Sequence, residues 1–329
     1  MAKVLVTGGV GFVGCHLIGR LLDRGHEIHV VDNLSRGRLD PDFAEVLQHP
    51  GVRFVEADLT VETPFAGFAP DYDYVYHLAA VVGVDHVRCR PDRVLYVNTV
   101  ATLRLFEWLK DNCRGLRKVL FSSTSEVYAG TMKHYGVPVP TPEDVTLTLD
   151  DLQSPRTTYA LSKIVGESIC HTYGRKYDIP VTIVRYHNVY GPRMGFAHVI
   201  PELMIRAHKA KDALEVYSPD HTRAFCYVDD AVEGTIRLAE ADAARGEVVH
   251  VGNGEDEITI RALAEKIVRL VHPGLSLRPL GATEGSPARR CPDTGKMDRL
   301  VGFKARVPLE EGLRRTWAWY KKHVDDVYE

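Results

Sequence analysis

Cysteine pairs, clustered histidines and long apolar runs are all missing from this chain of 329 residues. Its six cysteines form no Cys-x-x-Cys motif, so we expect neither a disulfide framework nor a zinc site. The 15 histidines are dispersed without the spacing of metal ligands, and we predict no bound metal. Because no apolar run is long enough to span a bilayer, the sequence predicts no transmembrane helix.

An excess of charge of one sign is also missing. The 41 Lys and Arg residues against 44 Asp and Glu residues give a formal net charge of −3, so no basic field would attract nucleic acid. The sequence opens on a strand-like segment and shows no signal-peptide pattern. These observations predict a cytoplasmic protein with neither a nucleic-acid partner nor a membrane partner.

The amino-terminal segment has the pattern of a dinucleotide-binding unit. A short apolar strand at residues 3–7 runs into a glycine-rich turn at 8–14 and an amphipathic helix. A second strand at 27–31 then ends in Asp32. Strand, glycine turn, helix, strand and acid in this order predict that the chain binds a dinucleotide.

The residues of this unit have separate expected roles. Gly8 permits the tight turn, Gly11 lets the backbone approach a pyrophosphate, and Gly14 lets the helix pack closely. Asp32 is placed to accept hydrogen bonds from the adenosine ribose, and its charge would repel a 2′-phosphate. This favours NAD over NADP, although Arg36 and Arg38 nearby are cations that could pair with such a phosphate.

Tyr159 and Lys163 are four residues apart, which places both side chains on one face of a helix. A tyrosine hydroxyl ordinarily titrates near ~10, and an ammonium beside it favours the phenolate and lowers that pKa. The spacing is common by chance, but behind a dinucleotide-binding start it predicts a proton-abstracting pair.

Alternating strand and helix patterns predict an α/β fold with a doubly wound parallel sheet of Rossmann type. We divide the chain into an NAD-binding domain at 1–185 and a smaller interwoven lobe at 186–329, with some later segments returning to the first. The expected strands are 53–56, 74–78, 118–122, 181–185, 215–217 and 248–251. The expected helices are 92–112, 155–177, 201–210, 229–239, 260–271 and 309–323, and 129–152 is expected to be a loop over the site.

Ordered motifs along nearly the whole chain resemble the extended short-chain dehydrogenase/reductase family, specifically its nucleotide-sugar epimerases, dehydratases and decarboxylases. The motifs are 7–14, Asp58-Leu59, 77–80, Asn98, 121–128, the Tyr159 and Lys163 pair, 185–193, 222–230 and 308–312.

The resemblance implies a set of site residues. Tyr159, Lys163, Thr124 and Glu126 would be catalytic. The NAD site would contain Gly8, Gly11, Phe12, Val13, Gly14, Asp32, Asn33, Asp58, Leu59, Leu78, Ala79, Ala80, Asn98, Lys163 and Tyr186. The substrate, a nucleotide-diphosphate sugar and preferably a UDP-sugar, would contact Ser125, His187, Asn188, His198, Val199, Tyr217, Arg223, Arg290 and Asp293.

In this family a sugar hydroxyl at C4 is oxidised to a ketone, and the fate of that ketone defines the enzyme. Glu126 and the carboxy-terminal half resemble UDP-glucuronate decarboxylases, whereas the loop at 81–86 has the length found in epimerases. Ser125 stands where 4,6-dehydratases have an aspartate, and His187 stands where the family usually has phenylalanine. We expect C4 epimerisation narrowly ahead of UDP-glucuronate decarboxylation, with 4,6-dehydration third.

Two further expectations come from the resemblance. The alternative outside the enzymes is a non-catalytic NAD-binding sensor with the same fold. The presence of Tyr159, Lys163 and Thr124 argues against it. The family usually forms homodimers through two helices, here 92–112 and 155–177, which would make a four-helix interface.

Overall fold

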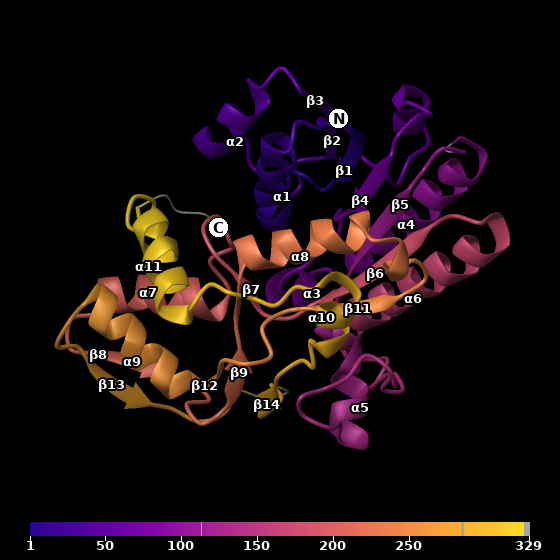
Figure 1. Ribbon diagram of the computed structural model, residues 1–329. Coiled ribbons are helices and arrows are strands. Elements are labelled where there is room, and N and C mark those ends of the chain that lie inside the picture. Colours follow the sequence, from indigo (N-terminus) through magenta and orange to yellow (C-terminus); the bar gives the residue numbers. More distant parts are fainter. Residues whose placement is uncertain (113, 284–285, 326–329) are drawn as a thin grey trace.

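The computed structural model describes residues 1–112, 114–283 and 286–325, so Cys113 lies outside the described part (Figure 1). A seven-stranded parallel sheet lies at its centre, in the order β11-β6-β5-β4-β1-β2-β3. Its strands are β1 (Lys3–Thr7), β2 (Glu27–Asp32), β3 (Val52–Glu56), β4 (Tyr74–His77), β5 (Lys118–Thr124), β6 (Val181–Tyr186) and β11 (Val248–Val251). The expected doubly wound parallel sheet is confirmed.

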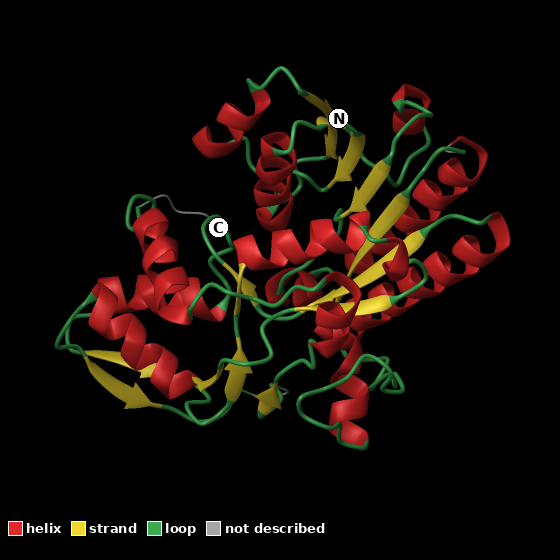
Figure 2. Ribbon diagram, viewed as in Figure 1, coloured by secondary structure: helices red, strands yellow, loops and turns green. Residues whose placement is uncertain are grey.

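Helices cover both faces of this sheet (Figure 2). They are α1 (Phe12–Asp23), α2 (Pro41–Leu47), α4 (Pro91–Asn112), α6 (Pro155–Tyr177), α8 (Val228–Glu240) and α10 (Gly295–Val301), while α3 (Val84–Cys89) packs on α4 and α6. Along β1, Val4 and Val6 join the core beneath α1 and α8, while Leu5 joins the core beneath α4 and α6. Side chains of a strand alternate between the faces of a sheet, so an almost wholly apolar strand supplies both cores.

A smaller lobe packs beside the sheet, at the lower left of Figure 1. Its helices are α7 (Val199–Lys209), α9 (Ile260–Val271) and α11 (Leu309–Tyr320). Its short strands are β7 (Val189–Tyr190), β8 (Ala213–Val216), β9 (Thr222–Ala224), β10 (Cys226–Tyr227), β12 (Glu257–Thr259), β13 (Ser276–Pro279) and β14 (Arg289–Arg290). The division of the chain at residue 185 stays a proposal, since β11 from the later half pairs with β6.

One expected loop differs in the structure. Residues 129–152 were expected to lack regular structure, but they begin with a short helix, α5 (Ala129–His134), directly after a 3-10 turn at Ser125–Tyr128. Gly130 packs against the backbone of Thr148, where a Cβ would lie 1.9 Å from the Thr148 carbonyl oxygen. This tertiary contact stabilises a turn that the composition of the whole segment does not indicate.

The candidate site lies where several of the parallel strands end. The chain leaves β1 toward one side of the sheet and β4 toward the other, so the connections diverge between these two neighbouring strands. Sheets of this kind bind ligands outside the carboxyl ends of their strands, at such a switch point. The carboxyl ends of β1, β2, β4, β5 and β6 carry or directly precede most of the residues expected to bind cofactor.

Candidate active site

The glycine-rich turn after β1 leaves no room for side chains. Gly8 has a φ of +72°, and a Cβ there would lie 2.5 Å from the Ala79 backbone nitrogen. A Cβ on Gly14 would lie 2.6 Å from the Gly8 carbonyl oxygen. Gly11 caps α1 without a side-chain hydrogen bond, and the first turn of α1 has no acidic residue. The positive end of the helix is therefore open to an anion, which fits the pyrophosphate of a dinucleotide.

Asp32 lies at the end of β2, beside this turn. Its Oδ2 accepts a hydrogen bond from the Val10 backbone N–H at 3.1 Å, and its Oδ1 accepts one from Leu34 at 2.9 Å. Burial raises the pKa of Asp32, while these backbone donors oppose that shift. Each carboxylate oxygen has a second lone pair, so the side chain can also accept hydrogen bonds from a ribose.

Other residues expected to bind cofactor surround the same cleft, and several have partners within the chain. Asn98 on α4 accepts from the Val81 N–H at 2.7 Å and donates to the Ser162 hydroxyl at 3.0 Å, which fixes the loop after β4 against α6. The Tyr186 hydroxyl pairs with Thr235 of α8 at 2.9 Å. The positions Phe12, Val13, Asn33, Asp58, Leu59, Leu78, Ala79 and Ala80 lie on α1 or just after β2, β3 and β4. Their contacts with cofactor remain predictions.

Three catalytic candidates lie together between β5 and α6. α6 begins at Pro155, whose fixed φ suits the first turn of a helix. Thr124 ends β5, and its hydroxyl hydrogen-bonds that of Tyr159. Lys163, one turn further along α6, is buried and donates to the Ser122 carbonyl at 2.7 Å. Its ammonium lies over the Phe121 ring, 5.1 Å from the centroid.

The expected lowering of the Tyr159 pKa by Lys163 is wrong for this structure. Burial raises the pKa of Tyr159 above its ordinary value, and the charge of Glu126 raises it further. Burial also lowers the pKa of Lys163 to about 8. Lys163 is directed at the end of β5 and is not among the charges that shift Tyr159, which are those of Glu126 and Arg36.

Glu126 forms an ion pair with Arg290 of β14. The Arg290 Nη1 donates to Glu126 Oε1 at 2.7 Å, and the two side chains are 11% and 31% exposed, Arg290 being the more buried. The Arg290 charge holds the pKa of Glu126 below its ordinary value, so this carboxyl is ionised. Arg290 Nε is buried without a hydrogen-bond partner among the described residues.

Arg223 lies on the neighbouring strand β9, in register with Arg290. It donates to the Ser286 hydroxyl at 2.9 Å, and burial, together with the Arg290 charge, lowers its pKa to about 10. Two arginines and one carboxylate leave an excess of positive charge here. This arrangement suits an anionic group of a substrate.

The other residues expected to bind substrate do not all converge. Asn188 donates to the Ala224 carbonyl at 2.9 Å, and Asp293 accepts from the Gly295 N–H at 2.7 Å. Tyr217 is 49% exposed, with Arg206 over its ring, and no contact joins it to the arginine pair. Ser125 is buried beside Glu126; His198 is the N-cap of α7 and Val199 its first residue.

His187 is buried, and both of its ring nitrogens have no hydrogen-bond partner in the described structure. Its ring packs on that of His250 with 4.4 Å between centroids. Burial and the neighbouring positive groups hold the pKa of His187 well below its ordinary value, so the ring is neutral. It therefore offers one donor and one acceptor behind the Glu126 and Arg290 pair.

Two features were missed in the sequence. Arg185 pairs with Glu167 on α6 at 2.7 Å and donates to the Tyr128 hydroxyl at 2.6 Å; Tyr128 in turn bonds His250 at 2.6 Å. This buried network holds α6 against β6 behind the catalytic residues. The second feature is the position of Arg36, which the sequence suggested only as a partner for a 2′-phosphate: a Cβ on Gly83 would lie 3.5 Å from its Nη2. Glu167, the acidic partner of Arg185, lies four residues after Lys163. This spacing could have indicated that Glu167 and Lys163 share one face of the helix.

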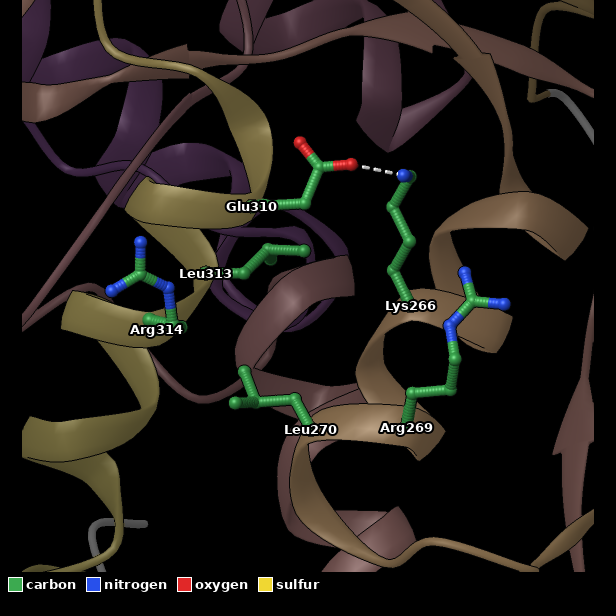
Figure 3. Close-up of a pocket in the computed structure, with 6 residues that line it drawn as sticks. All are labelled: Lys266, Arg269, Leu270, Glu310, Leu313 and Arg314. Carbon is green, nitrogen blue, oxygen red and sulfur yellow. Dashed lines mark hydrogen bonds and ion pairs between the residues drawn. The ribbon is translucent and has the colours of Figure 1, made fainter.

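A groove between α9 and α11 lies apart from these residues. It is lined by Lys266, Arg269, Leu270, Glu310, Leu313 and Arg314, and Lys266 is ion-paired with Glu310 (Figure 3). Within the part of the chain that the structure describes, no cluster of three or more His, Cys, Asp or Glu could hold a metal ion. The described part of the chain also contains no helix that is long and apolar enough to cross a bilayer.

Comparison with known proteins decides the family. The sequence model of the NAD dependent epimerase/dehydratase family matches residues 4–252. The chain belongs to this family. It is an enzyme that uses NAD and acts on a nucleotide-diphosphate sugar, as the motifs predicted.

Both decarboxylases and epimerases are among the proteins to which the chain is similar. A UDP-N-acetyl-alpha-D-glucosaminuronate decarboxylase of Bacillus cytotoxicus is 33% identical and covers 98% of this chain and 99% of its own. UDP-glucuronic acid decarboxylase 1 of Xenopus tropicalis is 31% identical over 98% of this chain and 73% of its own. Among solved structures, a UDP-glucose 4-epimerase of Thermotoga maritima has a TM-score of 0.83 at 28% identity, covering 98% of this chain and 100% of its own.

The cofactor is also seen in a solved relative. The Bordetella bronchiseptica enzyme WbmF in complex with NAD+ has a TM-score of 0.81 at 30% identity, covering 98% of this chain and 93% of its own. The fit of the glycine turn and of Asp32 to a dinucleotide agrees with it.

Proposed function

We propose that this enzyme decarboxylates a UDP-hexuronate through a transient 4-keto sugar. The observation that carries the proposal is the ion pair of Glu126 with Arg290, next to Arg223. A carboxylate on the sugar needs a cation near C5, and a second acidic group beside Tyr159 has no role in simple C4 epimerisation. The decarboxylases among the relatives support the same choice.

The residues have distinct tasks in this reaction. Thr124 holds the C4 hydroxyl of the sugar, and Tyr159 accepts its proton. NAD+ bound in the cleft would supply the hydride acceptor for the oxidation at C4 and, once reduced, the hydride donor for the final reduction. Tyr159 can accept this proton only as a phenolate, so its own proton must first pass to solvent, against the effect of burial on its pKa. It later gives the accepted proton back to the C4 oxygen.

The ketone at C4 makes loss of the C5 carboxylate possible. Arg290 and Arg223 position the substrate carboxylate. The negative charge of Glu126 disfavours the charged form of that substrate carboxylate at the site. The bond from C5 to the carboxylate breaks, its electrons move toward the C4 oxygen, and CO2 leaves. A proton then returns to C5, and the ionised Glu126 carboxylate is placed to take one from water and relay it there.

C4 epimerisation, which the sequence analysis placed narrowly first, becomes the second candidate because the curated relatives include decarboxylases. The loop at 81–86, whose side chains at 84 and 85 lie outside the described part, has the epimerase length, and the Thermotoga maritima epimerase shares the fold. An epimerase would rotate its ketosugar and return the hydride to the opposite face, with no need for the Glu126 carboxylate. 4,6-Dehydration is third.

Product masses test the proposal. The purified enzyme is incubated separately with UDP-glucuronate, its 2-acetamido analogue, UDP-glucose and UDP-N-acetylglucosamine, with Tyr159→Phe as the matched control. We expect loss of CO2 from one or both uronates, and none with Tyr159→Phe. An unchanged mass with a new sugar stereoisomer by NMR would establish epimerisation instead, and loss of water would establish dehydration.

A further inference from the structure

A line of buried hydrogen bonds connects α6 with the segment that follows β14. It begins at Glu167 of α6, which is paired with Arg185. Arg185 donates to the Tyr128 hydroxyl, and that hydroxyl bonds the His250 ring, each at 2.6 Å. Nδ1 of the same ring lies 3.0 Å from the backbone carbonyl oxygen of Asp293. The four side chains are at most 5% exposed, so water does not compete for these hydrogen bonds.

The direction of each hydrogen bond in this line is fixed. A carbonyl oxygen only accepts, so Nδ1 is the nitrogen of His250 that carries the proton. Burial lowers the pKa of His250 to about 3, so the ring is neutral and its Nε2 can only accept. The Tyr128 hydroxyl must therefore donate to Nε2 and accept from the Arg185 guanidinium. Removal of that hydroxyl would leave Nε2 of His250 without a donor.

The far end of the line lies close to Arg290 in the chain. Asp293 is three residues after Arg290, whose strand β14 has only two residues and pairs with β9. The Asp293 N–H donates to the Thr141 carbonyl at 2.8 Å, and the Thr141 N–H donates to the Cys291 carbonyl at 2.9 Å. Because His250 belongs to β11, an edge strand of the central sheet, its ring joins this segment to the sheet.

The loop that contains Thr141 is held by the same line. Glu143, two positions later, accepts through its carboxylate from the His250 backbone N–H at 3.0 Å. Its backbone carbonyl accepts from the Arg185 guanidinium, also at 3.0 Å. The segment that carries Arg290 is therefore attached to the line twice, once at its own carbonyl and once through this loop.

We propose that Tyr128 and His250 are positioning residues for Arg290, which set the distance of its guanidinium from the catalytic end of α6. Tyr159 lies on α6, where the line begins, and Arg290 lies beside the segment where it ends. A small displacement of a group that holds the reacting part of a substrate slows a reaction strongly. The inference rests on the proposed function, in which Arg290 positions the substrate carboxylate.

A double-mutant cycle on CO2 release, with the uronate that the wild type decarboxylates, tests the proposal. The variants are Tyr128→Phe, Arg290→Lys and the two together. We expect Tyr128→Phe to slow CO2 release about tenfold or more while single-turnover reduction of the cofactor keeps its wild-type rate. It should add little to Arg290→Lys, because the hydroxyl acts through that guanidinium. Tyr320→Phe, which removes a buried tyrosine hydroxyl from α11, is the matched control and should release CO2 like the wild type.

Two substitutions of His250 that are close in size separate positioning from packing. The amide nitrogen of an asparagine is as far along the side chain as Nδ1, so His250→Asn can still donate to the Asp293 carbonyl, whereas His250→Leu cannot. We expect His250→Leu to slow CO2 release about tenfold or more and His250→Asn to slow it much less. Calorimetric titration of NAD+ shows that each variant is folded and should give the wild-type affinity.

Other outcomes would overturn the assignment. Additive effects of Tyr128→Phe and Arg290→Lys, or equal losses in His250→Asn and His250→Leu, would exclude an action through Arg290. Equal loss of cofactor reduction and of CO2 release would mean that the line supports Tyr159 instead. If the wild type released no CO2 from either uronate, the proposed function would fail. The same cycle would then be measured on the dissociation constant of UDP-glucuronate, where the coupling to Arg290 must still appear.

Discussion

Glu126 and Arg290 are 164 positions apart in the sequence and lie 2.7 Å apart in the structure, joined by a hydrogen bond between Oε1 and Nη1. The 3-10 turn after β5 positions the carboxylate, and the edge strand β14 positions the guanidinium. The pair thus joins the catalytic end of the sheet to the second lobe. Loss of either member would leave a partly buried charge without its partner.

We therefore predict that Glu126→Gln reduces CO2 release by about 100-fold or more, the range for loss of a general acid–base group. Arg290→Lys should also reduce it, because an ammonium does not reproduce the planar guanidinium. The first half-reaction should persist, because Tyr159 and Thr124 are unchanged. Single-turnover absorbance of the reduced cofactor measures the oxidation, and product mass measures the loss of CO2. Arg289→Gln, which removes the neighbouring exposed pair with Glu257, is the control and should retain wild-type activity. Equal loss of both half-reactions would contradict a role specific to C5.

The Glu126 carboxylate also affects the pKa of Tyr159, the base of the oxidation step. Its negative charge raises the pKa of Tyr159, so its removal must lower that pKa. In Glu126→Gln the rise of the oxidation rate with pH should therefore shift to lower pH than in the wild type. The measurement is the pH profile of single-turnover cofactor reduction. A profile that stays in place or shifts to higher pH would show that Glu126 does not act on Tyr159.

An apolar face of α4 leads to a prediction about assembly. Leu95, Tyr96 and Leu103 are 38%, 51% and 39% exposed on this helix, which packs along α6. Exposed apolar patches of this kind mark interfaces, and we predict a homodimer through α4 and α6. Sedimentation of the wild type at micromolar concentration should give a dimer, and the double variant Tyr96→Glu with Leu103→Glu should give a monomer. Leu39→Glu, at an equally exposed leucine outside α4, should stay dimeric. A monomeric wild type would refute the interface.

What the sequence could predict follows from the range of the interactions involved. The turn at Gly8 and the helix carrying Tyr159 depend on residues within a few positions of each other, so spacing alone predicted them. The direction of the Tyr159 pKa shift depends on burial, which spacing does not reveal, and here the prediction was wrong. The pairing of Glu126 with Arg290 depends on two lobes that meet only after folding. The order of the motifs could assign Glu126 and Arg290 to the site, but it could not predict that the two side chains form an ion pair.

Gly14 and Gly19 of α1 offer a matched test of the cofactor cleft. A Cβ on Gly14 would lie 2.6 Å from the Gly8 carbonyl oxygen and 2.7 Å from Gly9, both backbone positions that cannot rotate away. Around Gly19 there is nothing within 4 Å of the position that a Cβ would take. Gly14→Ala should therefore displace the glycine turn, weaken NAD+ binding about tenfold or more and destabilise the fold by about 1–3 kcal/mol, the usual effect of overpacking.

Gly19→Ala should do the reverse. It replaces a flexible residue inside a helix without a clash, so the free energy of unfolding should rise by up to about 1 kcal/mol while NAD+ affinity stays at the wild-type value. Denaturant unfolding and calorimetric titration of NAD+ measure both quantities in each variant. If Gly14→Ala bound NAD+ like the wild type, the close packing of α1 on the turn could not be what shapes the diphosphate site. Because the two substitutions are chemically identical and lie on one helix, a difference between them reports the space around each glycine and not helix propensity.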